Sequence, residues 1–151
     1  MNTTTRILFV CHGNICRSPM AEFVMKKLVA DAGRTDEFEI ASAATSTEEL
    51  GNRVHRGTAR VLDRLSIDYS GKRARQISRS EYEKWDLIVV MDEANVRNAR
   101  RIFGGDPERK IRKLMAYAGE SRDVADPWYT GDFEQTYRDV DKGCRALLKT
   151  L

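Results

Sequence analysis

Hydrophobic positions along the chain follow two patterns, continuous runs and stripes at helical spacing. Residues 7–10 (Ile-Leu-Phe-Val) and 87–90 (Leu-Ile-Val-Val) are continuous apolar runs, which is the pattern of parallel strands covered on both faces. Residues 38–42 alternate and predict a further strand, and residues 111–118 predict the last one. The chain therefore predicts four strands, separated by stretches long enough for helices.

Apolar residues spaced by three and four positions predict the helices. Such a stripe occurs in four longer stretches: residues 19–33, 58–65, 93–103 and 133–151. Asp92 is expected to cap the third of these helices. Ser78 and Glu81 form a capping-box pattern that opens a shorter helix. Residues 69–76 are basic and irregular with room for a short strand, and residues 119–132 form a polar connection.

Strands that alternate with helices predict an α/β fold, with a parallel sheet, right-handed crossovers and helices on both faces. The 151 residues are enough for an ordinary core, so we expect residues 1–151 to form a single domain. Binding sites in such sheets lie beyond the carboxyl ends of the strands. Three features map to that edge: the loop after Cys11, the loop after Ser42, and Asp92.

The loop between the first strand and the first helix carries the candidate chemistry. Residues 11–18 read Cys-His-Gly-Asn-Ile-Cys-Arg-Ser. Backbone N–H groups of such a loop and of a helix N-terminus bind anions, and positive neighbours favour the thiolate form of a cysteine. Arg17 supplies a fork of donors that fits two phosphoryl oxygens. Gly13 and Asn14 tolerate unusual backbone angles, and Ser18 is placed to donate a hydrogen bond to the Cys11 thiolate.

Composition narrows the class of protein. A formal net charge of +3 suits an anionic substrate but is well below the bias of a dedicated nucleic-acid binder. Three cysteines form no disulfide framework, and no stretch has the length of a signal or membrane segment, so we expect a cytoplasmic protein. Cys11 and Cys16 lack a second ligand pair, so no metal site is expected. Cys144 lies on an apolar stripe and is expected in the core.

A different class, nucleic-acid binding, is suggested by a set of basic positions. Acidic residues are interspersed among them and no base-stacking motif accompanies them, so a solvated face is the expected account. The basic positions are Arg53, Arg56, Arg60, Arg64, Lys72, Arg73, Arg75 and Arg79.

The Cys-x5-Arg-Ser motif at the end of the first strand resembles that of the low-molecular-weight protein tyrosine phosphatases. Four further blocks are similar to this family, in family order: residues 42–46, 74–77, 91–95 and 126–129. The resemblance implies a flavodoxin-like, three-layer α/β/α fold with a four-stranded parallel sheet and no cofactor. It also implies phosphotyrosine proteins or peptides as substrates, inorganic phosphate as product, no nucleic-acid or membrane partner, and a monomer or weak dimer.

The resemblance further implies a two-step mechanism. Cys11 attacks the phosphoryl group to form a phosphocysteine, which water then hydrolyses, while Arg17 stabilises the equatorial oxygens. Asp126 matches the general acid, although Asp106-Pro107 is a second copy of the same dipeptide. Trp128 and Tyr129 are expected either to wall the cleft or to pack in the core.

Other residues match the family's phosphate-binding loop and its supports. The loop residues are His12, Gly13, Asn14, Ile15, Cys16 and Ser18. Ser42, with Asn14 and Ser18, matches residues that brace the loop, and Asp92 matches a structural acid of the family. Cys16 is expected either to form a reversible disulfide with Cys11, which protects the nucleophile, or to pack beneath the loop.

Two positions depart from the family pattern, and one separates related activities. Lys72 and Arg73 stand where the family commonly has a histidine, and Glu48 replaces an aromatic residue that faces the substrate, which disfavours acidic peptides. Ile15 favours phosphotyrosine, because related arginine phosphatases tend to have threonine there. Related arsenate reductases need cysteines in mid-chain, and residues 17–143 contain none. A non-catalytic phosphate sensor would lack Cys11 or Asp126, and both are present.

Overall fold

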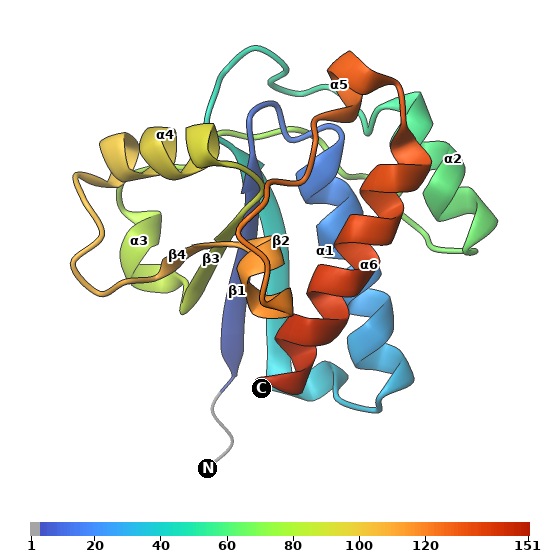
Figure 1. Ribbon diagram of the computed structural model, residues 1–151, viewed down its shortest axis with the longest axis horizontal. Coiled ribbons are helices and arrows are strands. Elements are labelled where there is room, and N and C mark those ends of the chain that lie inside the picture. The colour runs from blue at the N-terminus through green and yellow to red at the C-terminus, as the bar shows by residue number, and fades with distance from the viewer. Residues whose placement is uncertain (1–3) are drawn as a thin grey trace.

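The computed structural model describes residues 4–151 and shows a parallel sheet between two layers of helices (Figure 1). The strands are β1 (Thr5–Cys11), β2 (Phe38–Ala44), β3 (Leu87–Val90) and β4 (Ile111–Lys113), in the spatial order β2-β1-β3-β4. Every neighbouring pair is parallel, so all four carboxyl ends lie at one edge. The predicted three-layer α/β fold with a four-stranded parallel sheet is confirmed.

Helices cover both faces of the sheet. On one face lie α1 (Arg17–Asp31), α2 (Arg56–Arg64) and α6 (Phe133–Lys149), and on the other lie α3 (Glu81–Lys84) and α4 (Glu93–Phe103) (Figure 1). The short helices are η1 (Thr35–Glu37), η2 (Leu114–Ala118) and α5 (Pro127–Thr130). Among residues 4–151, no helix combines the length and the apolar character needed to cross a membrane.

Strand β1 supplies both hydrophobic cores. Ile7 and Phe9 belong to the core beneath α1, α2 and α6, whereas Leu8 and Val10 belong to the core beneath α3 and α4. All four side chains are fully buried, as a continuous apolar run predicts for a strand covered on both faces. The strand that ends at Cys11 is therefore held on both sides.

Some predicted boundaries are wrong. The last strand ends at Lys113, and residues 114–118 instead form the 3₁₀ helix η2, which turns so that Leu114 and Met115 are fully buried. Helix α1 begins at Arg17 rather than at Pro19, and β2 continues through Ala44.

The basic segment 69–76 holds no strand of its own, because its pairing is limited to two isolated bridges, Arg53 with Arg73 and Ala44 with Gln76. The predicted capping box at Ser78 forms in part. The Glu81 carboxylate accepts a hydrogen bond from the Ser78 backbone N–H at 2.7 Å, but the N-cap residue of α3 is Ser80.

Candidate active site

The phosphate-loop candidate, residues 11–18, curls around the N-terminus of α1. Asn14 has a positive φ of 58°, a left-handed conformation that asparagine tolerates better than most residues. The N-cap residue Cys16 makes no side-chain capping bond within the described chain. The Cys16 side chain therefore does not occupy this helix N-terminus, whose partial positive charge favours an anion.

The Cys11 sulfur is surrounded by donors. It lies 3.0 Å from the Ser18 hydroxyl oxygen and accepts from the Ser18 backbone N–H at 3.4 Å. Asn14 Nδ2 donates to the same hydroxyl at 2.8 Å. Because that hydroxyl oxygen already accepts from Asn14, its own proton is free to point at the sulfur, and this stabilises a thiolate.

A buried chain of polar groups supports the loop from behind. Asn14 Nδ2 also donates to Ser42 Oγ at 3.0 Å, and that hydroxyl donates to the Glu22 carboxylate at 2.5 Å. Lys72 Nζ donates to the Ser42 carbonyl at 2.9 Å and lies 3.7 Å from Glu22 Oε1. Lys72 therefore belongs to the polar network that supports the loop. Sequence analysis missed Glu22, which is buried although it lies on a helix rich in exposed charge.

Arg17 is fixed by two acids and a carbonyl. Its Nη1 donates to Asp92 at 2.7 Å and to the Val124 carbonyl at 3.0 Å, and its Nη2 lies 3.4 Å from Asp126 Oδ2. Burial by itself lowers the pKa of the guanidinium, but the Cys11 sulfur and the hydrogen bond to Asp92 raise that pKa above its ordinary value. Arg17 therefore stays charged beside the sulfur.

Asp92 does two things at once. One oxygen binds Arg17, and the other accepts from the Asn95 backbone N–H at 2.8 Å as the N-cap of α4. Asn95 in return accepts from the Asp92 backbone N–H at 3.2 Å. The predicted cap is confirmed, and it holds the carboxylate that orients the arginine.

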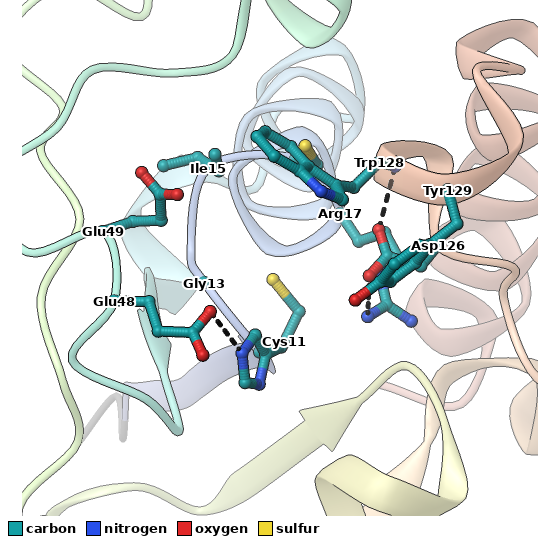
Figure 2. A pocket seen from close by; sticks show the side chains of 11 residues that line it. Cys11, Gly13, Ile15, Arg17, Glu48, Glu49, Asp126, Trp128 and Tyr129 are labelled. Carbon is teal, nitrogen blue, oxygen red and sulfur yellow. Dashed lines mark hydrogen bonds and ion pairs between the residues drawn. The ribbon is translucent and has the colours of Figure 1, made fainter.

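The two Asp-Pro dipeptides have different surroundings. Asp126 is the N-cap of α5, where Oδ1 accepts from the Trp128 backbone N–H at 3.0 Å, and its carboxylate lines the same cavity as Cys11 (Figure 2). The Asp106 carboxylate instead accepts hydrogen bonds from the Tyr82 hydroxyl at 2.5 Å and from the Lys110 N–H at 2.8 Å. Of the two aspartates, Asp126 alone lines the cavity that contains Cys11.

The cavity has a volume of about 110 Å³ and is walled unequally on its two sides (Figure 2). Trp128 is 57% exposed and Tyr129 is 85% exposed, so neither packs in the core. On the opposite side, the Glu48 carboxylate accepts a hydrogen bond from His12 Nε2 at 2.9 Å. The full lining is Cys11, His12, Gly13, Ile15, Cys16, Arg17, Glu48, Glu49, Asp126, Trp128 and Tyr129.

All three cysteines are buried free thiols, and Cys11 and Cys16 line the cavity. Burial, together with the neighbouring Cys11, raises the pKa of Cys16 to about 12. Burial also raises the pKa of Cys144, which packs in the core as predicted. Within residues 4–151, no group of three histidine, cysteine or acidic side chains is arranged to hold a metal ion.

Comparison with known proteins gives one consistent result. The family model for low molecular weight phosphotyrosine protein phosphatases matches residues 6–151. The chain is 38% identical to the protein-tyrosine-phosphatase YfkJ of Bacillus subtilis, covering 96% of this chain and 94% of that protein. It is also 38% identical to the human low molecular weight phosphotyrosine protein phosphatase, covering 97% and 95%.

Solved structures agree with this result. The crystal structure of YfkJ superposes with a TM-score of 0.94 at 37% identity, covering 98% of this chain and 94% of that one. The low molecular weight protein tyrosine phosphatase SP-PTP of Streptococcus pyogenes superposes with a TM-score of 0.88 at 42% identity, covering 98% and 93%.

Proposed function

This chain belongs to the low molecular weight phosphotyrosine protein phosphatase family and is a protein tyrosine phosphatase, and on that premise we propose that it works through a phosphocysteine on Cys11. One observation carries the proposal. The Cys11 sulfur, the Arg17 guanidinium and the Asp126 carboxylate converge on one cavity (Figure 2).

In the first step, the Cys11 thiolate attacks phosphorus and the bond from phosphorus to the phenolic oxygen breaks. Asp126, protonated at the start, gives its proton to the leaving oxygen. The Ser18 hydroxyl and the helix N-terminus hold the thiolate before attack. The result is a phosphocysteine and a neutral phenol.

Arg17 stabilises the transferring group with the donors it has left. A guanidinium has five N–H donors. Within the described residues, Asp92 and Val124 use both donors of Nη1, and Asp126 faces Nη2. The Nε–H and the second Nη2–H remain for two phosphoryl oxygens, in the bidentate arrangement that makes arginine effective on phosphates.

In the second step, the Asp126 carboxylate takes a proton from a water molecule, which attacks the phosphocysteine. The sulfur leaves as a thiolate, which Ser18 again stabilises, and inorganic phosphate is released. No other group is required for either step, because the acid of the first step is the base of the second.

The rim determines which peptides fit. Trp128 and Tyr129 offer aromatic surface to a phosphotyrosine ring, whereas Glu48 and Glu49 make the opposite wall acidic (Figure 2). We expect acidic residues beside the phosphotyrosine to weaken binding, since like charges would meet at this rim. Replacing Glu48 with lysine is expected to reverse this preference.

The test uses two variants, two aryl phosphates and three phosphopeptides. Cys11→Ser should bind phosphate but release no phenol from an aryl phosphate, and turnover by this variant would overturn the proposal. Asp126→Ala should lower kcat/KM by about 10²–10⁴-fold for phenyl phosphate and far less for p-nitrophenyl phosphate, whose leaving group needs no acid. A parallel assay on phosphotyrosine, phosphoserine and phosphoarginine peptides tests the substrate class. Preference for phosphoarginine would favour the alternative activity.

A further inference from the structure

His55 joins three elements at the edge of the proposed active site. Its ring stacks on Phe133 with 5.0 Å between ring centroids and an interplanar angle of 15°. The same ring meets Trp128 edge-on, at 5.6 Å and 78°. Phe133 begins α6 and Trp128 belongs to α5, and both helices lie at the end of the molecule where α2 starts (Figure 1). One imidazole therefore links α2 to the helix that carries Trp128.

Hydrogen bonds hold His55 from both sides along the chain. Its backbone N–H donates to the Ile15 carbonyl of the phosphate loop at 2.9 Å. Its ring Nδ1 accepts from the Gly57 backbone N–H at 3.0 Å and so caps α2. Since Nδ1 is an acceptor here, the proton of the neutral ring lies on Nε2. The ring is thereby fixed relative to the phosphate loop.

Gly57 allows the start of α2 to lie close to Phe133 at the start of α6. A Cβ atom at position 57 would collide with the Phe133 ring, so only glycine permits the start of α2 to approach α6 this closely. The close approach places His55 between Phe133 and Trp128. The contacts of His55 with Phe133 and Trp128 therefore depend on the backbone at Gly57 as well as on the rings themselves.

Trp128 in turn orients the carboxylate of Asp126. Asp126 Oδ1 accepts from the Trp128 backbone N–H at 3.0 Å, while Oδ2 lies 3.4 Å from Arg17 Nη2. Trp128 is 57% exposed and its ring contact is with His55. The contact with His55 therefore restrains the same residue whose backbone N–H binds Asp126.

We propose that His55 is a positioning residue for the general acid, acting through the Trp128 indole to hold the Asp126 carboxylate at the leaving oxygen. The inference rests on the proposed role of Asp126. His55 does not touch the substrate in this scheme, and its ring, not its capping nitrogen, performs the role. The position of the Asp126 carboxylate depends on the edge contact of the His55 ring with Trp128 and on its stack on Phe133.

Two substitutions separate the effect of the His55 ring contacts from the effect of its N-cap hydrogen bond. His55→Asn removes the ring but keeps an oxygen that accepts from the Gly57 N–H, because asparagine is among the best N-cap residues. His55→Phe keeps an aromatic ring between Phe133 and Trp128 but removes the acceptor. The measurement is kcat/KM for phenyl phosphate and for p-nitrophenyl phosphate, together with Tm for each variant.

In His55→Asn, we expect kcat/KM for phenyl phosphate to fall about tenfold, less than the 10²–10⁴-fold contribution of a general acid because the acid is displaced and not removed. The value for p-nitrophenyl phosphate should change less than twofold. In His55→Phe, the ratio between the substrates should stay as in the unmodified protein, while Tm falls by about 2–4 °C from the lost cap.

Either of two results would overturn the inference: an unchanged substrate ratio in His55→Asn, with or without an equal loss on both substrates, or the same ratio change in His55→Phe as in His55→Asn. A double-mutant cycle provides a further check. In a Trp128→Ala background, His55→Asn should leave the ratio unchanged, and an additive effect would contradict transmission through the indole. Asp126→Ala measured alongside shows separately whether Asp126 is the acid at all.

Discussion

Asn14 gives the sharpest stability prediction, because one small side chain both braces the phosphate loop and sits in a left-handed conformation. The residue is 1% exposed, and its φ is 58°. Its Nδ2 donates to Ser18 Oγ and to Ser42 Oγ, and its Oδ1 accepts from the Arg75 N–H at 3.3 Å. Asn14→Ala removes all three bonds and leaves a Cβ in the left-handed region.

The expected loss of stability follows from the lost hydrogen bonds and from the backbone conformation. Two well-formed buried hydrogen bonds are worth about 1 kcal/mol each, and the bond from Arg75 is too long to add much. A non-glycine residue without a compensating side chain costs about 1–2 kcal/mol in the left-handed conformation. Asn14→Ala should therefore lower the free energy of unfolding by about 3–4 kcal/mol, which lowers Tm by roughly 10 °C in a chain of this length.

Asn14→Gly is the matched control. It loses the same bonds but carries no Cβ, so it should be more stable than Asn14→Ala by about 1 kcal/mol, which reverses the usual order of these two residues. The assay is urea unfolding followed by tryptophan fluorescence, since Trp85 is 1% exposed in the folded protein. If alanine is as stable as glycine at position 14, or if neither variant loses stability, the account of this loop is wrong.

Three further predictions come from other parts of the molecule. Gly143→Ala should destabilise the protein by about 1–3 kcal/mol although alanine favours helices, because the new Cβ would collide with Leu114; a rise in Tm would refute this. Peroxide treatment should produce a Cys11–Cys16 disulfide, which mass mapping detects. The disulfide should form faster as pH rises, because the pKa of Cys16 is about 12 and more of its thiol is then ionised. Detection of Cys11 sulfonate without a disulfide would contradict this prediction. Folding lowers the pKa of His55 below its ordinary 6.5 through burial and the charge of Arg56, so the unfolded chain binds this proton more tightly and stability is lost as pH falls below 6.5. The decrease in Tm from pH 7 to pH 5 should accordingly be smaller in His55→Phe than in the unmodified protein.

The strands and the site motif could be predicted because their signals are local. An apolar run as short as residues 7–10 fits a buried strand better than a helix because of its length, and Asp92 caps its helix through backbone groups within three residues. Residues 114–118 were predicted as strand and form a 3₁₀ helix, because the packing of Leu114 against Gly143 decides their conformation. That contact joins segments far apart in sequence.

Among the residues that support the site, too, some are revealed by the sequence and others are placed only by contacts between distant segments. The family resemblance pointed to Ser42 and Asn14, but Glu22 on α1 has the sequence pattern of one more charged residue on a solvated helix. Its burial results from the approach of β2 and Lys72, which no periodicity reveals. His55 likewise lacks any motif, and its ring contacts exist only because Gly57 admits Phe133.

The two halves of the proposed site are far apart in the sequence, and this separation affects when the site is assembled during synthesis and folding. The phosphate loop follows β1 at the start of the chain, whereas Asp126 precedes α6, which packs along α1 (Figure 1). During synthesis the thiol loop leaves the ribosome long before its acid. If Asp126 is the acid, a nascent or refolding chain should gain its full activity on phenyl phosphate only after the segment that carries Asp126 packs beside the phosphate loop.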